Sequence, residues 1–303
     1  MHVRILFLIL AFSSSCLAQQ MADSLYHPEI AHPLFETGKG PLVLIDEAHY
    51  NFHTRDGRYA PFTAILESDG LVVKSNTSAF SAKALSGCGL LVIANALNEK
   101  NSVSWSLPTP SAFTKREIRE LKKWVSQGGS LFLIADHMPF AGAATELAAA
   151  FGFTCYNGYA MKDDKQPDVF TWENKRLVRD SLFGDSVRTV RTFTGQGFDC
   201  PEEAHSFLVL DTAFTMYFPA VEGQFKTDCP TQNAGGMVQG AYLAYGKGRL
   251  VISGEAAMFT AQVANGKPMG MNAPEATDNL TLLRVLIRWL TVDPASFRRS
   301  SDR

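Results

Sequence analysis

Residues 124–137 read WVSQGGSLFLIADH, and this stretch decides the fold. The pair Gly128-Gly129 ends a helical pattern, and the apolar run 130–135 that follows has the length of a buried strand. Asp136 and His137 come directly after that run. A helix, a tight turn, a buried strand and then polar residues are typical of a mostly parallel sheet with helices on both faces.

The same alternation extends on both sides of this stretch. Residues 114–117, Thr-Lys-Arg-Glu, form a capping box that predicts the start of the helix before the double glycine. Further strands are predicted at 42–45, 71–74 and 89–94, and further helices at 59–68, 78–87, 142–151 and 279–290. Strands and helices that alternate at this spacing predict a doubly wound α/β fold.

Residues 153–235 interrupt this rhythm. Short β-like runs stand there among polar loops, at 187–193, 207–210 and 214–218. The sheet resumes with a predicted hairpin, in which runs 241–245 and 250–253 flank the turn Gly246-Lys247-Gly248. We therefore expect one α/β domain over residues 19–303, with a β-rich insertion at about 153–235.

The composition is that of a globular protein. The chain has 303 residues, of which 46% are hydrophobic and 19% are charged, so it can bury a full core without metal or disulfide staples. Its formal net charge is -2 and its pI is about 6.4. No cluster of Lys or Arg lies along one face, which argues against nucleic acid and anionic membrane surfaces as partners.

The N-terminus has the order of a secretory signal peptide. His2 and Arg4 precede the apolar stretch 5–12, and small residues follow it. We expect a signal peptide over residues 1–18 and a periplasmic or secreted protein. The alternative is a lipoprotein with a lipid anchor at Cys16. No other segment reaches the roughly 20 apolar residues of a membrane span, so we expect no transmembrane segment in the mature protein.

Four cysteines follow the predicted signal peptide. Cys200 and Cys229 stand beside prolines in polar loops and are the predicted disulfide pair, since an oxidising compartment permits pairing. Cys88 opens an apolar strand and is expected to be a buried thiol. The spacings of Cys88, Cys155, Cys200 and Cys229 match no zinc-ribbon or zinc-finger pattern.

Acidic, amide and histidine side chains gather at the downstream ends of the predicted strands. The carboxyl ends of parallel strands meet at one edge of a sheet, where open α/β sheets bind their ligands. We therefore expect a ligand-binding crevice at this edge. Its candidate residues follow three different strands and are Asp46, Glu47, His49, Asn51, Asp136, His137 and Glu255.

The same residue types can bind a divalent metal. His49, Asp136 and His137 are the candidate ligands for Zn²⁺ or Mn²⁺. Glu47, His137 and Glu255 are the candidates for an acid or base that activates a metal-bound water. No His-Glu-x-x-His motif is present. This hypothesis describes a metal-dependent hydrolase.

Structural roles compete with these functional ones. Asp46 and Asp136 can equally cap helices or bond loop amides, and Glu255 needs a metal, a substrate hydroxyl or a helix N-terminus as partner. We expect His53 to be a solvated loop residue and His137 to be half-buried. Several aromatic residues suit either a stacking platform for a sugar or core packing, namely Tyr50, Phe52, Tyr59, Phe140 and Phe259.

Two smaller features have simple structural interpretations. Residues 194–197, Thr-Gly-Gln-Gly, lack the strand-then-helix setting of a phosphate-binding loop and are expected to form a turn. Asp278 stands before the last predicted helix and is expected to be its N-cap. Neither feature is therefore counted among the candidate ligand-binding residues.

Three blocks carry a resemblance to a known superfamily. They are 43–51 (VLIDEAHYN), 124–137 and 248–255 (GRLVISGE). They resemble the class I glutamine amidotransferase-like superfamily, and more narrowly its uncharacterised exported branch related to gliding-motility transporter auxiliary proteins and intraflagellar-transport N-terminal domains. The resemblance spans about 40–152 and 240–290, and it implies a flavodoxin-like, doubly wound, mostly parallel sheet.

The resemblance also bears on activity. In active amidotransferases of this fold, the strand after the Gly-Gly turn ends in a nucleophilic Cys. Here residues 135–137, Ala-Asp-His, stand at that position, and no His precedes Glu255 as the catalytic dyad would require. The resemblance therefore implies an exported ligand-binding domain for a small molecule, a glycan or a cell-envelope component. The alternative is the metal-dependent hydrolase that uses the same residues.

Overall fold

The computed structural model describes residues 20–164 and 166–292, so the predicted signal peptide and Cys16 lie outside the described residues. Five parallel strands of its largest sheet stand in the order β3-β2-β4-β5-β15. The register is continuous, since Leu133 pairs with Ile93 on one side and with Ile252 on the other. These strands are β2 (Leu42–Asp46), β3 (Val72–Asn76), β4 (Cys88–Ala94), β5 (Ser130–Ile134) and β15 (Gly248–Ser253).

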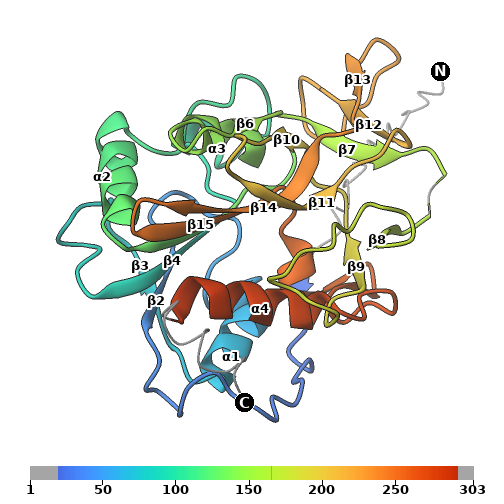
Figure 1. Cartoon of the computed structure of the whole chain (residues 1–303). Helices are drawn as coiled ribbons and strands as arrows, with labels where there is room; N and C mark the ends of the chain where they lie inside the picture. Colours follow the sequence, from blue (N-terminus) through green and yellow to red (C-terminus); the bar gives the residue numbers. More distant parts are fainter. Residues whose placement is uncertain (1–19, 165, 293–303) are drawn as a thin grey trace, which may run out of the picture.

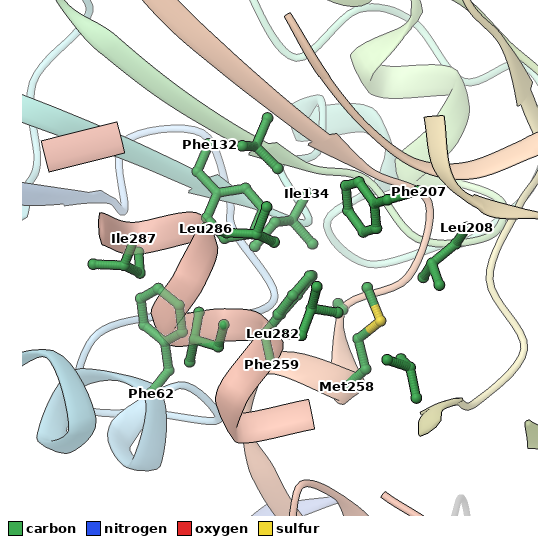
Figure 2. Close-up of a cluster of buried hydrophobic side chains, with 14 of the residues drawn as sticks. Phe62, Phe132, Ile134, Phe207, Leu208, Met258, Phe259, Leu282, Leu286 and Ile287 are labelled. Carbon is green, nitrogen blue, oxygen red and sulfur yellow. The ribbon is translucent and has the colours of Figure 1, made fainter. Parts of the chain in front are cut away.

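Helices cover both faces of these strands (Figure 1). Alternate residues of each strand point to opposite faces, so both sets must be apolar. Phe132 packs in one buried cluster with Leu286, while its neighbour Leu131 packs in another with Leu121. Figure 2 shows the first cluster, where side chains of α1 and α4 meet those of β5. The helices are α1 (Ala60–Ser68), α2 (Lys115–Ser126), α3 (Phe140–Ala149) and α4 (Asn279–Thr291).

The predicted capping box forms at the start of α2. The Thr114 hydroxyl accepts a hydrogen bond from the Glu117 backbone N–H at 3.3 Å, and the Glu117 carboxylate accepts one from the Thr114 N–H at 3.0 Å. By contrast, the helix predicted at 78–87 is wrong, because this segment forms turns. The Phe80 N–H donates to the Glu117 carboxylate at 3.0 Å, so a tertiary partner replaces a helical one.

The described residues between α3 and the hairpin form strands and loops, which we call the lobe (154–233). The strands β6, β10 and β11 extend the large sheet beside β14, while β7, β12 and β13 form a separate sheet and β8 pairs with β9. Their bounds are β6 (Thr154–Cys155), β7 (Tyr159–Lys162), β8 (Asp168–Thr171), β9 (Thr189–Thr192), β10 (Phe198–Asp199), β11 (His205–Val209), β12 (Phe214–Tyr217) and β13 (Thr231–Asn233).

The predicted hairpin is confirmed, since β14 (Val238–Tyr245) pairs antiparallel with β15. Residues 194–197, predicted as a turn, form a loop with a bend at Thr194, and the Gln196 N–H donates to the Gly254 carbonyl just after β15 at 2.8 Å. Gly195 has a φ of +91°, and a Cβ there would stand 2.4 Å from the Gly254 carbonyl oxygen, so only glycine fits. The remaining elements are β1 (Met21–Ala22), β16 (Ala261–Ala264), β17 (Lys267–Gly270) and the short 3₁₀ helices η1 (Glu99–Asn101) and η2 (Ala257–Phe259).

The cysteines correct one prediction. All four cysteines of the described residues are free thiols, so Cys200 and Cys229 do not pair. The Cys200 sulfur instead accepts a hydrogen bond from the Ser206 hydroxyl at 3.7 Å. Cys88 is buried, as expected for a thiol that opens an apolar strand. Within residues 20–164 and 166–292, none of the helices has the length and apolar character needed to span a membrane.

Candidate functional site

A pocket of about 670 Å³ lies at the carboxyl ends of the parallel strands. Four separate segments contribute to its wall immediately after β2, β4, β5 and β15, and the lobe contributes Phe193 and Glu222. This is the edge where the sequence predicts a ligand-binding crevice. The residues that line it include Phe52, His53, Arg58, Asn95, Trp105, Asp136, His137, Phe140, Phe193, Glu222 and Ala257.

Asn95 ties the strand ends together beneath the pocket. Its backbone N–H donates to Ile134 of β5, and its carbonyl accepts from the Phe52 N–H, each at 2.9 Å. Its side-chain oxygen accepts from the Asp136 N–H at 2.9 Å, while its amide nitrogen lies 3.1 Å from Nδ1 of His53. Asn95 has a φ of +50°, a left-handed conformation that asparagine tolerates better than most residues. One residue thus fixes three segments of the wall.

His53 is buried in the pocket wall, with 3% of its side chain exposed, so the prediction of a solvated loop histidine is wrong. Burial, helped by the charges of Arg58 and His137, lowers the pKa of His53 to about 3. The ring is therefore neutral at physiological pH. Both ring nitrogens of His53 are engaged within the protein, since Nδ1 lies 3.1 Å from the Asn95 amide nitrogen and Nε2 lies 3.3 Å from that of Gln262.

Asp136 and Glu255 form a buried pair of carboxyl groups. Asp136 lines the pocket and accepts a hydrogen bond from the His137 N–H at 2.7 Å. Glu255 is fully buried behind it and accepts from the N–H groups of Ala257 and Met258 at 2.7 and 2.8 Å. Burial raises the pKa of Asp136, and burial together with the charge of Asp136 raises that of Glu255 well above its usual value. The pair therefore favours holding a proton.

His137 lines the pocket beside Asp136 and is half-buried, in agreement with its prediction. Its ring stacks on that of Tyr159, with the centroids 4.2 Å apart, and its Nδ1 lies 2.7 Å from the Met138 carbonyl oxygen. That contact requires Nδ1 to carry a proton, which leaves Nε2 to face other partners. Of the residues predicted for the crevice, Asp136 and His137 are the two that line this pocket.

His49 does not join them. Its Nδ1 lies 2.8 Å from the Asp46 carboxylate and its Nε2 lies 2.9 Å from that of Glu117, so both ring nitrogens are engaged. The ring also packs against Phe80 and Phe113. Asp46 and His49 thus form a buried link between β2 and α2, away from the residues that line the pocket.

Glu47 and Asn51 also do not line the pocket as predicted, because their side chains form hydrogen bonds elsewhere in the fold. The Glu47 carboxylate accepts hydrogen bonds from the Arg55 N–H at 2.8 Å and the Ser75 hydroxyl at 2.9 Å. The Asn51 side chain accepts from the His49 N–H at 3.1 Å. Both residues therefore shape the loop after β2, and neither is among the pocket lining residues.

The predicted metal ligands are not assembled. His49 is bound by two carboxylates elsewhere, while Asp136 and His137 line the pocket. Among residues 20–164 and 166–292, no group of three or more His, Cys, Asp and Glu side chains is arranged to hold a metal ion. The expectation of Zn²⁺ or Mn²⁺ at His49, Asp136 and His137 is therefore corrected. The strand ends do converge, but His49 bonds Asp46 and Glu117, whereas Asp136 and His137 line the pocket.

Aromatic rings form one wall of the pocket. Phe52, Trp105 and Phe140 contact one another, with ring centroids 5.0 to 5.5 Å apart and Trp105 edge-on to both neighbours. Phe52 and Phe140, two of the five rings considered for a stacking platform or for core packing, thus line the pocket. Tyr59 and Phe259 are fully buried in the core, and Tyr50 is half exposed, so these three do not contribute.

Several pocket residues escaped the sequence analysis. Trp105 lies in the loop after η1, and its carbonyl accepts a hydrogen bond from the Glu222 N–H at 2.8 Å. Ser106 and Val221 form an isolated β-bridge next to this contact. The loop and the lobe therefore hold each other against the pocket. The sequence offered one signal for Trp105, which is a tryptophan within a polar, Ser-rich loop. No local pattern indicated that this loop pairs with residues more than a hundred positions away.

Fold and site together define an α/β protein with a ligand-sized pocket at the carboxyl ends of its parallel strands. No family model matches the chain, and no curated protein matches it. Among solved structures, the mmIFT52 N-terminal domain is 14% identical, with a TM-score of 0.57, over 83% of this chain and 98% of that chain. At this identity the similarity shows the fold alone. The matching structure is an N-terminal domain of the kind that the three sequence blocks resemble.

Two further structures match with lower TM-scores. A ThuA-like protein from Bacteroides uniformis is 12% identical, with a TM-score of 0.44, over 87% of this chain and 94% of that chain. A cytoplasmic protein from Salmonella typhimurium is 11% identical, with a TM-score of 0.47, over 83% of this chain and 97% of that chain.

Proposed function

We propose that this protein binds a saccharide, either free or as part of a cell-envelope component, in the pocket at the carboxyl ends of its parallel strands. The observation that carries the proposal is the composition of that pocket, in which the rings of Phe52, Trp105 and Phe140 lie beside the polar groups of Asp136 and His137. Its volume of about 670 Å³ is in the range of small-molecule sites.

A saccharide suits both kinds of surface. Its C–H faces pack on aromatic rings, while its hydroxyls both donate and accept hydrogen bonds. Burial raises the pKa of Asp136, which makes its protonated, donating form more accessible, and its carboxyl oxygens can accept hydrogen bonds in either form. The rings and polar groups are held by contacts with the sheet, so little ordering entropy is lost on binding.

Two finer proposals accompany this function. We take the five parallel strands as a flavodoxin-like core, because their order β3-β2-β4-β5-β15 follows the 2-1-3-4-5 pattern of such folds. We also propose export to the periplasm or beyond, on the pattern of residues 1–18. Protease protection of the chain in intact cells, lost on opening the outer compartment, would test export. The metal-dependent hydrolase has no observation in its favour and is not proposed.

Titration calorimetry against a panel of neutral, amino and acidic sugars, with soluble peptidoglycan fragments, tests the proposal. We expect at least one saccharide to bind, and we expect Trp105→Ala to weaken that binding by about tenfold, because it removes a ring from the wall. Trp172→Ala is the matched control, since Trp172 packs on Arg179 in the lobe and does not line the pocket. No binding across the panel, or equal effects of both substitutions, would overturn the proposal.

A further inference from the structure

Arg58 places a positive charge in the pocket wall, and it has no carboxylate partner within residues 20–164 and 166–292. Its guanidinium lies over the Phe52 ring, with Cζ 3.6 Å from the centroid, and Nη1 donates to the Phe52 carbonyl at 3.2 Å. Its Nε is buried and meets no hydrogen-bond acceptor in the described part of the chain. Arg55, three residues earlier, instead forms ion pairs with Asp56 and Glu67. The charge of Arg58 is thus uncompensated.

Burial at this position has an electrostatic cost. It lowers the pKa of Arg58, which means that the surroundings solvate the guanidinium less well than water does. An anion placed against the guanidinium would recover that lost solvation. Because arginine stays charged at physiological pH, the protein cannot relieve the cost by losing the proton.

The guanidinium is also held in place before any ligand arrives. The Thr260 hydroxyl donates to the Arg58 carbonyl at 2.9 Å and fixes the backbone. The Phe52 ring beneath the guanidinium is itself packed against Trp105 and Phe140. A planar cation fixed on an aromatic face keeps its N–H groups in one plane, and neighbouring pairs of these groups match the two oxygens of a carboxylate.

In the described part of the chain, the other ionisable groups that line the pocket form no ion pair with Arg58. His53 is neutral, as its pKa of about 3 requires. Burial raises the pKa of Asp136, and burial together with the charge of Asp136 raises that of Glu255, so this pair resists carrying two negative charges. The remaining acid, Glu222, bonds the Tyr159 hydroxyl. Among the described residues that line the pocket, Arg58 is the one Lys or Arg.

We propose that the ligand carries a carboxylate and that Arg58 binds it, so the saccharide class is that of the sugar acids. This inference rests on the proposed function and narrows its ligand. The aromatic wall packs on the sugar ring, and the guanidinium beside it pairs with the acid group of the same molecule. Recognition of the carboxylate is then the main source of discrimination against neutral sugars.

Two pairs of probes test this inference, glucuronate against glucose and N-acetylmuramate against N-acetylglucosamine. Glucuronate has a carboxylate where glucose has a hydroxymethyl group, and N-acetylmuramate adds a lactyl ether that carries the carboxylate. For wild-type protein, calorimetry should show tighter binding of the acid in at least one pair, by about tenfold or more. Arg58→Gln should abolish that preference, because it weakens binding of the acid far more than binding of the neutral partner. Arg58→Lys, which keeps the charge and loses the paired geometry, should restore part of it.

Arg55→Gln is the matched control, because it removes a neighbouring arginine whose partners lie outside the pocket, and it should preserve the preference. Thermal melting of each variant checks that the fold is retained. Equal binding of acid and neutral sugars, or an acid preference that survives Arg58→Gln, overturns the inference while leaving the proposed saccharide site intact. Failure of every sugar in the wider panel would overturn both.

Discussion

Glu255 is a carboxyl group with no exposed surface, and its pKa depends on its burial, on the charge of Asp136 and on its hydrogen bonds. The N–H groups of Ala257 and Met258 bond it, which favours the ionised form, but burial and the charge of Asp136 outweigh them. Because its folded pKa is raised, its stabilising contribution is full below the unfolded value of about 4.5 and is lost as pH rises through the folded value. The same sign applies to Asp136.

We therefore expect the free energy of unfolding of the wild-type protein to fall as pH rises above about 4.5. The slope should reach up to about 1.4 kcal/mol per pH unit for each proton released. Glu255→Gln cannot ionise, so it should flatten the dependence even if its stability at low pH is reduced. Urea unfolding at a series of pH values measures the slope. Glu29→Gln, on an exposed residue, is the control and should leave the slope unchanged. A slope in Glu255→Gln equal to that of wild type would contradict this account.

At the residue scale, sequence reasoning located the edge of the sheet that carries the pocket but not the direction of each side chain. Asp136 and His137 follow β5 directly and line the pocket as predicted. Asp46 ends β2 in the same way, yet its carboxylate turns to His49, which reaches Glu117 from a distant helix. A strand end fixes the position of a Cα atom, whereas partners supplied by other elements decide where the side chain points.

At the scale of elements, the contact of His49 with Asp46 and Glu117 joins the end of β2 to the first turn of α2. Burial alone would lower the pKa of His49, but the hydrogen bonds and charges of the two acids outweigh it and raise that pKa. The stabilisation is therefore full below about pH 6.5 and is lost as pH rises through the folded pKa. For Glu117, whose pKa is lowered, stabilisation is present above about 4.5 and is lost below its folded value.

His49→Ala should destabilise the protein by about 3 kcal/mol near pH 6, because it leaves the buried carboxylates of Asp46 and Glu117 without their partner. The loss should be smaller at about pH 9, because the stabilisation by the ring falls as pH rises from 6.5 through the raised folded pKa of His49. Chemical denaturation at the two pH values gives both numbers. His27→Ala, on an exposed residue, should have little effect at either pH. A loss that does not depend on pH would show that the ring acts by packing alone.

Helices and strands were predictable where the local pattern of apolar residues matched the burial of that segment in the fold. The strands β2, β4 and β5 are apolar on both faces, and both faces are covered. Local signals failed where a residue had a better distant partner. Asp278 stands at the predicted N-cap of α4, but its carboxylate accepts from the N–H groups of Arg188 and Thr189, each at 2.8 Å, and makes no cap bond.

At the scale of the whole molecule, α4 closes one face of the sheet (Figure 1). Leu286 is fully buried in the cluster shared with α1 and β5 (Figure 2). Leu286→Ala should cost about 3 kcal/mol of unfolding free energy, because the rigid surroundings cannot fill the cavity. Leu25→Ala, at a leucine that is 87% exposed, should change it by less than about 0.5 kcal/mol.

Urea unfolding measures both values, and an unchanged m-value would show that the unfolded and native states keep their compactness. Near-equal effects of the two substitutions would mean that α4 does not share a cooperative core with the sheet. The order of strands and helices on which this core depends could be predicted from alternation along the chain. The way in which the lobe meets the pocket could not, because its contacts join residues without any shared local pattern.

The bridge between Ser106 and Val221 joins the two parts of the chain that together form this side of the pocket. Trp105 belongs to the connection after η1 and Glu222 belongs to the lobe, and both face the same space. Any molecule that touches both walls is coupled to their attachment, and thermodynamic reciprocity makes the effect equal in both directions. A bound ligand would slow hydrogen exchange at the bridge between Ser106 and Val221. A substitution that weakens this bridge would weaken ligand binding by the same free energy.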